Sequence, residues 1–228
     1  MLQIYVTKTN AYVCIFVDEG LGGTVNNSQS QKSICCVTDE FSAINCLETI
    51  KQGFEIKLVI CYETREDVIH LVKIVDKILP RMLKSEVELE FHKISKFGKN
   101  SEDLLSKNSL ITNILIKSAK EKQISHISLA TSPLIFPSTY IETLQKRIFS
   151  AGIIPHISLS GIDAEIMKNA REIGMEKYIP KIEKFLKSNL AKSKSKLKNN
   201  EKTVKKIIKV KLGPNNVHTI LDSLEIEH

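Results

Sequence analysis

The stretch 34–53 combines residue types and spacing that are suited to phosphate chemistry. A short apolar run, Ile34–Val37, ends in the polar turn Thr38, Asp39 and Glu40, and a helical pattern of apolar residues follows. A strand that leads directly into a helix is a common phosphate site, because free backbone N–H groups and the helix dipole face the anion. Such a turn normally contains glycines, which let the backbone approach the phosphate closely. This turn has no glycine and has two acids instead.

The cysteines and histidines have no spacing that indicates a metal site. Cys35 and Cys36 are adjacent in a predicted strand, so their side chains point to opposite faces and cannot share an ion. The odd number of cysteines and the absence of a CxxC motif favour reduced, buried thiols. The histidines lack HxxxH and HxxEH spacing, so no metal is expected. The acids near residues 63–67 are typical of a helix start, where the dipole favours them. The cysteines are Cys14, Cys35, Cys36, Cys46 and Cys61.

Length and composition indicate a globular α/β protein. The chain has 228 residues, of which 42% are hydrophobic and 26% charged, as expected for a packed domain. No apolar run approaches the roughly 18 residues of a membrane span. The N-terminus lacks the basic-then-apolar order of a signal peptide, so a cytoplasmic location is predicted. The absence of tryptophan argues against an aromatic platform that stacks single-stranded nucleic acid.

The positive charge is concentrated near the C-terminus. The chain has a formal net charge of +7, whereas residues 181–212 hold twelve lysines and two glutamates, a net charge of +10 that leaves −3 for the remainder. We predict a basic C-terminal tail, which is either a solubilising segment or a contact surface for RNA phosphates. The segment has no arginine and few aromatics, so it is not expected to read bases. The candidate RNA-binding residues are Lys192, Lys194, Lys196, Lys198, Lys205, Lys206 and Lys209.

Predicted strands and helices alternate along the chain. This order predicts a Rossmann-like, mostly parallel sheet with helices on both faces, plus a small N-terminal β-hairpin. Ligands of such sheets bind at the carboxyl ends of the strands, which would bring 38–42, 61–63 and 131–132 together. The strands are expected at 2–7, 12–17, 34–37, 54–62, 87–94, 126–130, 153–157 and 207–212, and the helices at 40–52, 66–83, 104–122, 138–151 and 163–173.

Weak motifs in a consistent order indicate a family. A linker of the type GxGGLPVGSQGK is matched by Gly20, Gly22, Gly23, Ser28 and Gln29. The sequence KQG at 51–53 stands where K-R-G is usual, and AREIG at 170–174 fits A-R-x-I-G. With these motifs, the chain resembles the C-terminal half of the ThiI tRNA 4-thiouridine synthetases, a PP-loop adenine-nucleotide-hydrolase-like (HUP) domain. Its start resembles the last hairpin of a THUMP domain. The expected division is a hairpin at 1–19, a linker at 20–32, a PP-loop-like domain at 33–180 and a lysine-rich segment at 181–228.

The resemblance also implies a nucleotide site, which this sequence changes. The family's PP-loop, S-G-G-x-D-S, falls on residues 37–42, where only Ser42 is kept, Thr38 and Asp39 replace the glycines and Phe41 replaces the acid. Carboxylates at this turn would repel a polyanion. A second nucleotide-binding strand falls on 128–140. The candidate nucleotide-binding residues are Thr38, Asp39, Ser42, Tyr62, Ala130, Thr131 and Ser132.

The family's sulfur-transfer cysteine is also missing. Its place falls on 107–113, KNSLITN, and no cysteine follows Cys61, so persulfide chemistry has no nucleophile. We therefore expect a catalytically inactive ThiI-like domain that binds RNA (tRNA) or a protein partner and needs no cofactor or metal. Two alternatives stay open: a protein or enzyme that holds AMP or ATP at the strand ends, and a structural homodimer.

Overall fold

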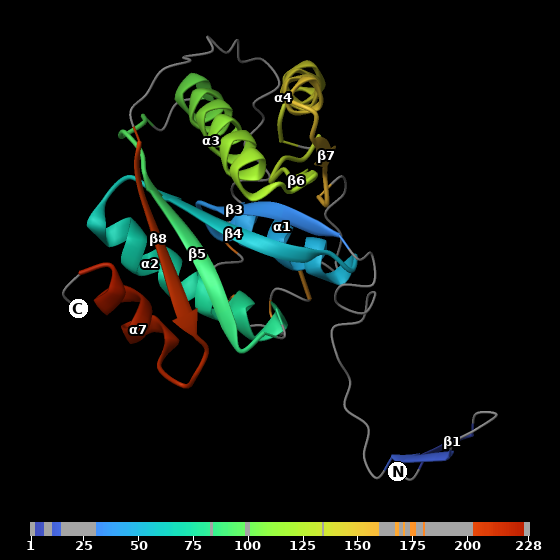
Figure 1. Ribbon diagram of the computed structural model, residues 1–228. Coiled ribbons are helices and arrows are strands. Elements are labelled where there is room, and N and C mark those ends of the chain that lie inside the picture. The colour runs from blue at the N-terminus through green and yellow to red at the C-terminus, as the bar shows by residue number, and fades with distance from the viewer. Residues whose placement is uncertain are drawn as a thin grey trace.

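The computed structural model describes most of the α/β domain (Figure 1). Residues 20–30 of the expected linker, most of the expected helix at 163–173 and the candidate lysines from 192 to 198 lie outside the described residues. The described residues are 3–6, 11–14, 31–82, 84–98, 101–133, 135–159 and 203–225, with isolated positions between 167 and 180.

Six of the described strands form one sheet in the order β7-β6-β3-β4-β5-β8. The five strands from β7 to β5 are parallel, and β8 runs antiparallel to β5. The mostly parallel α/β fold predicted from the sequence is therefore confirmed. The strands are β3 Lys32–Val37, β4 Glu55–Tyr62, β5 Glu86–Lys93, β6 His126–Ser128, β7 Ile154–His156 and β8 Val204–Lys211.

The N-terminal hairpin predicted from the sequence is present as a separate pair of strands. β1 (Gln3–Val6) and β2 (Ala11–Cys14) pair antiparallel, with Gln3 opposite Cys14. Both strands are shorter than the apolar runs that predicted them.

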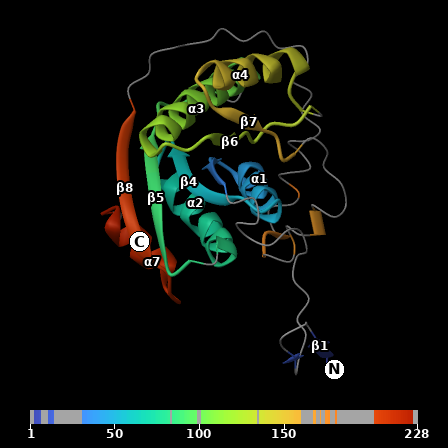
Figure 2. The ribbon, with the colours of Figure 1, turned by 45° about the vertical axis from the view of Figure 1, so that its right-hand side comes forward.

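Helices cover both faces of the larger sheet (Figures 1 and 2). Helices α3 and α4 lie on one face, and α1, α2 and α7 lie on the other. Helix α1 ends as the sequence predicts, because Gly53 takes the left-handed backbone (φ 89°) that stops a helix. The helices are α1 Glu40–Lys51, α2 Arg65–Ile78 with a 3-10 turn at Leu79–Met82, α3 Ser101–Lys122, α4 Ser138–Ser150 and α7 Asn216–Ser223.

The central strands β3 and β4 form the middle of the core. From Ser33 to Val37, every residue of β3 is buried. Cys36 and Cys61 place their Sγ atoms 3.6 Å apart on one face of the sheet, and burial raises the pKa of the Cys36 thiol. Cys35, Cys36, Cys46 and Cys61 are free and buried, which agrees with the expectation of buried, apolar thiols.

The expectation of a basic tail needs a correction for residues 203–225, because this segment is part of the domain. β8 pairs with β5 over its whole length, so that Lys211 lies opposite Glu86 and Lys209 opposite Glu88. Helix α7 then packs on α2, where Asn216 Nδ2 donates to Asp76 Oδ1 at 3.1 Å. The alternation of lysine and apolar residues in β8 therefore belongs to an edge strand, one face of which is matched to an acidic neighbour.

A buried carboxylate ties β8 to the rest of the fold. Glu90 of β5 is only 1% exposed. Its Oε1 lies 2.7 Å from His92 Nε2 and 3.2 Å from Lys205 Nζ. Its Oε2 accepts from Ser118 at 3.0 Å and lies 3.2 Å from Lys122 Nζ. Burial alone would raise the pKa of Glu90, but the hydrogen bonds from these four groups outweigh it and lower the pKa to about 2.

Glu90→Gln tests this network. We expect the substitution to lower the free energy of unfolding by about 3 kcal/mol at pH 7, because the half-buried ammonium groups of Lys122 and Lys205 each lose one of two carboxylate partners, the one that is buried. The pKa of Glu90 is about 2 in the fold and about 4.3 in an unfolded chain. Its stabilising effect is therefore complete above the unfolded value and is lost as the pH falls towards the folded value. Denaturant unfolding of both proteins at neutral pH and at successively lower pH measures the difference.

Glu121→Gln is the matched control, because Glu121 also pairs with Lys205 but its side chain is 44% exposed. Its effect should stay below about 1 kcal/mol. A difference between wild type and Glu90→Gln that does not shrink as the pH falls would contradict the assignment.

Candidate functional site

Two neighbouring cavities lie where β3 and β6 end, between the first turn of α1 and the side of α3. Thr38, Ser42, Asn108 and Ala130 line both of them. The structure brings five of the seven candidate nucleotide residues to these cavities: Thr38, Asp39, Ser42, Ala130 and Thr131.

The other two candidates do not line either cavity. Tyr62, at the end of β4, is half-buried, and burial raises its pKa. Ser132 is fully buried, and its carbonyl accepts from the N–H groups of Ile135 and Phe136 at 3.0 and 2.9 Å. Ser132 is thus placed to hold the β6–α4 loop in shape.

Side chains of the turn itself accept hydrogen bonds from backbone N–H groups at the start of α1. Ser42 Oγ accepts from the backbone N–H groups of Thr38 and Asp39 at 2.8 and 3.0 Å. The Asp39 carboxylate in turn accepts from the Ser42 N–H at 2.8 Å, which completes a capping box. Three N–H groups of this strand–helix turn are therefore used inside the turn.

The backbone of this turn does not require glycine. Asp39 has φ −167°, which is extended backbone that any residue adopts. Its carboxylate lies at the positive end of the helix dipole, where an anion is stabilised. The turn thus supplies its own anion at the place where the family's motif receives one.

Apolar side chains fill the space beside the turn. Phe41 is 4% exposed and Phe136 is 2% exposed, and both line the larger cavity. Phe136 also stacks on Tyr140, with ring centroids 6.1 Å apart. The space for the centres of water molecules is about 40 Å³ in the larger cavity and about 20 Å³ in the smaller. These spaces suit a few waters, and a nucleotide would need the side chains to move.

An ion pair closes one side of the larger cavity. Lys107 lines it from α3, and its Nζ lies 2.7 Å from Glu63 Oε1. Glu63 Oε2 also accepts from the N–H of Phe97 at 3.2 Å. Sequence reasoning assigned Glu63 to a helix-start cluster and missed this pair. The sequence contains only an indirect signal for this ion pair: Lys107 begins the segment 107–113, where the family has its sulfur-transfer cysteine.

One buried polar atom in the smaller cavity has no partner. Thr131 is 3% exposed and lines this cavity, and its Oγ1 makes no hydrogen bond. An unpaired buried hydroxyl is costly, so this atom marks a position where a water or a ligand atom would be stabilised.

The three described candidate RNA lysines lie on β8. Lys205 is bound to Glu90 and Glu121, Lys206 Nζ lies 3.5 Å from Glu225 Oε1, and Lys209 is exposed opposite Glu88. Acidic neighbours balance much of their charge, so β8 is a weaker phosphate surface than its composition suggests. Lys192, Lys194, Lys196 and Lys198 lie outside the described residues.

No metal-binding group was found in the part of the chain that the structure describes: no three His, Cys, Asp or Glu side chains there are arranged to hold an ion. Among the same residues, no helix is long and apolar enough to span a membrane.

Comparison with known proteins supports the fold class. No protein-family model matches the chain, and no curated protein sequence matches it. The structure is similar to a 4-thiouridine synthetase crystallised with RNA and bound ATP, with a TM-score of 0.59 and 18% identity over 84% of this chain and 54% of that one. It is also similar to PH1313 from Pyrococcus horikoshii Ot3, with a TM-score of 0.50 and 14% identity over 76% of this chain and 50% of that one.

At these identities the comparisons show the fold. The protein shares its α/β fold with the 4-thiouridine synthetase, and the chain spans about half the length of each of these two structures. The expected resemblance is therefore supported for the architecture.

The Asp39 cap gives a test of the turn. We expect Asp39→Ala to lower the free energy of unfolding by about 1 kcal/mol, because the Ser42 N–H loses its acceptor. Asp39→Asn keeps an acceptor oxygen at the same atom and should cost only a few tenths of that. Chemical denaturation of the three proteins measures the difference. Equal losses for Ala and Asn would show that the charge of Asp39 matters and that the hydrogen bond does not.

Proposed function

We propose that this protein is a catalytically inactive ThiI-like domain that binds RNA, with tRNA as the expected class, and acts as a binding module. The observation that supports it most directly is the first turn of α1. The Ser42 hydroxyl and the Asp39 carboxylate accept from three backbone N–H groups of the turn that stands where the family has its PP-loop.

Electrostatics strengthens this proposal. A pyrophosphate placed at the turn would lie beside the Asp39 carboxylate, and like charges at about 4 Å repel by about 4 kcal/mol at a partly buried site. The nearest cation lining the cavity, Lys107, is already paired with Glu63 at 2.7 Å. Binding a triphosphate would therefore require breaking both the cap and this ion pair.

The sulfur-transfer step lacks its reactive group. Residues 107–113 lie in α3, and Lys107 and Asn108 face the cavity where the family's reaction would need a thiol. Cys36 is the only cysteine among the residues lining the two cavities, and it is a buried thiol with a raised pKa. A raised pKa keeps the thiol protonated and weakly nucleophilic.

RNA is the favoured partner for two reasons. The 4-thiouridine synthetase of similar fold was crystallised with RNA. Residues 181–202 of this chain hold eight lysines and two glutamates, and such a basic segment binds phosphates without reading sequence. The lysines of β8 contribute less, because Glu86, Glu88 and Glu90 lie beside them.

A second candidate function is adenine-nucleotide binding without phosphate transfer. The unpaired Thr131 Oγ1 in the smaller cavity favours it, since adenine or ribose could supply the missing hydrogen bond. Against it, Phe136 and Ala130 leave too little space for a nucleotide unless the β6–α4 loop moves.

Nucleotide assays separate these candidates. We expect the protein to release no pyrophosphate from ATP in the presence of tRNA and to add no sulfur to tRNA, because the phosphate cradle is occupied and the nucleophile is absent. A coupled pyrophosphate assay and mass spectrometry of the tRNA measure this, with an active 4-thiouridine synthetase as the positive control. Calorimetry should show no heat with ATP. Heat with AMP that disappears in Thr131→Val would establish the second candidate, and tRNA-dependent release of pyrophosphate would refute both.

RNA binding is tested by substitution, because deletion after residue 180 would remove β8 and α7 from the fold. We expect neutralising Lys192, Lys194, Lys196 and Lys198 to glutamine to weaken RNA binding and to reduce the slope of log affinity against log salt by about 3. Titration of tRNA at several salt concentrations measures both quantities. Lys209→Gln with Lys211→Gln is the control on β8 and should change the slope by less than about 1, because acids lie opposite both lysines. An unchanged slope in the fourfold variant would refute the role of the segment.

A further inference from the structure

Strand β8 presents an open edge along eight residues. It is the last strand of the six-stranded sheet, and its partner is β5. No other strand among the described residues pairs with it, and it is the outermost strand of the sheet in Figures 1 and 2. An edge of this length exposes backbone N–H and C=O groups that can pair with a further strand.

The side chains of β8 combine apolar and basic groups. Val204 is 70% exposed and Ile207 is 46% exposed, and Lys209 and Lys211 are also exposed. Ile207, Lys209 and Lys211 share one face of the sheet, because alternate residues of a strand point the same way. The opposite face is buried at Ile208 and Val210. An added strand would therefore lie beside the row of Ile207, Lys209 and Lys211.

The positive charge of Lys209 and Lys211 determines which kind of segment can bind at the outer edge of β8. Two copies of β8 placed edge to edge would bring lysines close to lysines, which is unfavourable across strands. A segment with acids at alternate positions would place carboxylates beside Lys209 and Lys211. A nucleic acid would use the lysines but would leave the backbone groups and the apolar Ile207 without partners.

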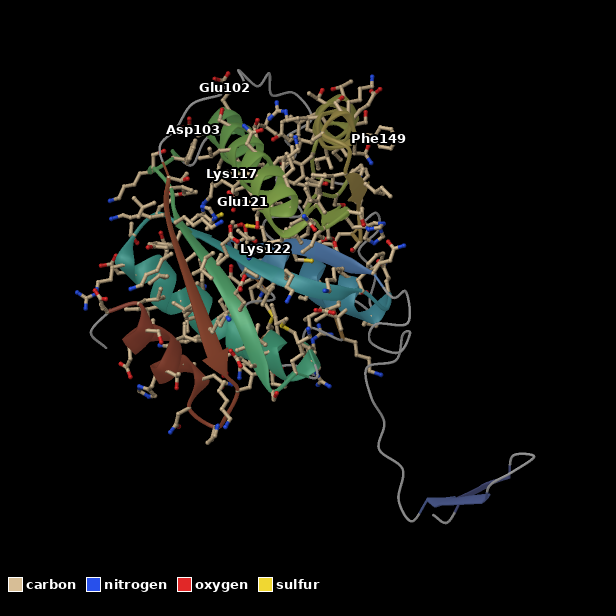
Figure 3. All side chains as sticks on the ribbon, viewed as in Figure 1. Glu102, Asp103, Lys117, Glu121, Lys122 and Phe149 are labelled. Atoms are coloured by element: carbon tan, nitrogen blue, oxygen red, sulfur yellow. The ribbon has the colours of Figure 1, made fainter. Side chains whose placement is uncertain are left out.

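The pairing of β8 with β5 indicates which sequence would fit the outer edge of β8. Its partner β5 has Glu86 opposite Lys211 and Glu88 opposite Lys209, in antiparallel register. Each lysine side chain projects from the face of the sheet and can contact a strand on either side of β8. A strand added at the outer edge would therefore meet the same alternation of residues that β5 meets at the inner edge. Figure 3 shows Glu121 and Lys122 at the end of α3 nearest the sheet. Glu121 pairs with Lys205, and Lys122 pairs with Glu90. The charged side chains at this end of β8 therefore already have partners within the protein.

We propose that the outer edge of β8 binds an extended acidic segment of a partner protein as a seventh strand. Its backbone pairs with β8, and acids at alternate positions lie beside Lys211 and Lys209, as Glu86 and Glu88 of β5 do on the inner edge. Such strand addition uses backbone hydrogen bonds for affinity and alternate side chains for specificity. The inference does not depend on RNA binding or on the state of the nucleotide cavities.

The experiment uses a fluorescein-labelled peptide with the sequence of residues 86–91, EVELEF, flanked by serines, and the full chain. Fluorescence anisotropy should show saturable binding that weakens as salt is raised. In ¹H–¹⁵N spectra, the peptide should shift the amide signals of 204–211 and should slow the solvent exchange of the outward-facing amides. Lys209→Gln with Lys211→Gln should weaken binding about tenfold, through the loss of two cross-strand charge pairs.

Matched controls distinguish this site from general attraction. Lys146→Gln removes an exposed lysine of α4, 74% exposed and paired only with Glu142 among the ion pairs of the described residues, and should leave the affinity unchanged. A peptide with Glu86→Lys, Glu88→Lys and Glu90→Lys should not bind. The proposal is overturned by equal binding of the two peptides, by signals that shift away from β8, or by an absence of binding. It is also overturned if an RNA oligonucleotide shifts the β8 amides and the acidic peptide does not, or if sedimentation shows that the open edge is filled by a second copy of the chain.

Discussion

The competition for the free N–H groups at the start of α1 decides what the carboxyl edge of this sheet can do. A helix N-terminus has a few unpaired donors, and they are satisfied by a ligand or by the protein. Here Ser42 Oγ takes two of them and the Asp39 carboxylate takes a third. Three donors of the turn are therefore satisfied without a phosphate. The overall fold is still similar to that of a 4-thiouridine synthetase, so the fold does not depend on the chemistry of this turn.

A second constraint acts at the other side of the sheet. The parallel part of the sheet ends at β5, and the antiparallel strand β8 covers that edge. Charge specifies the pairing of β8 with β5, as does the alternation of apolar residues. Glu86 and Glu88 lie opposite Lys211 and Lys209. The buried Glu90 forms ion pairs with Lys122 and Lys205. Most of the net positive charge that the composition assigns to the C-terminus therefore belongs to residues 181–202, and Lys205 of β8 serves the fold.

The sequence predicts most of the architecture because the central elements have strong local signals. The apolar runs of β3 and β4 and the helical spacing of α2 place these elements within a few residues of their observed bounds. β8 was predicted only as a short strand in a basic tail, since its lysine-rich composition is typical of solvated segments and its acidic partner lies far away in the sequence. The Glu63–Lys107 pair was missed for the same reason. The Asp39 turn was identified from the sequence, but its hydrogen bonds depend on the rotamer of Ser42, which no sequence pattern specifies.

The two cavities beside the turn follow from the same substitutions. In a PP-loop the glycines leave room for phosphates, whereas Thr38 and Asp39 have side chains, and Phe41 and Phe136 add buried apolar volume. Replacing small residues by larger ones in a site without a ligand removes empty space, which stabilises the fold through van der Waals contact. Only Thr131 Oγ1 stays unpaired in the remaining space. The side chains that fill this space therefore contribute packing to the fold, and both binding sites that we propose, the open edge of β8 and the basic segment 181–202, are formed by other residues.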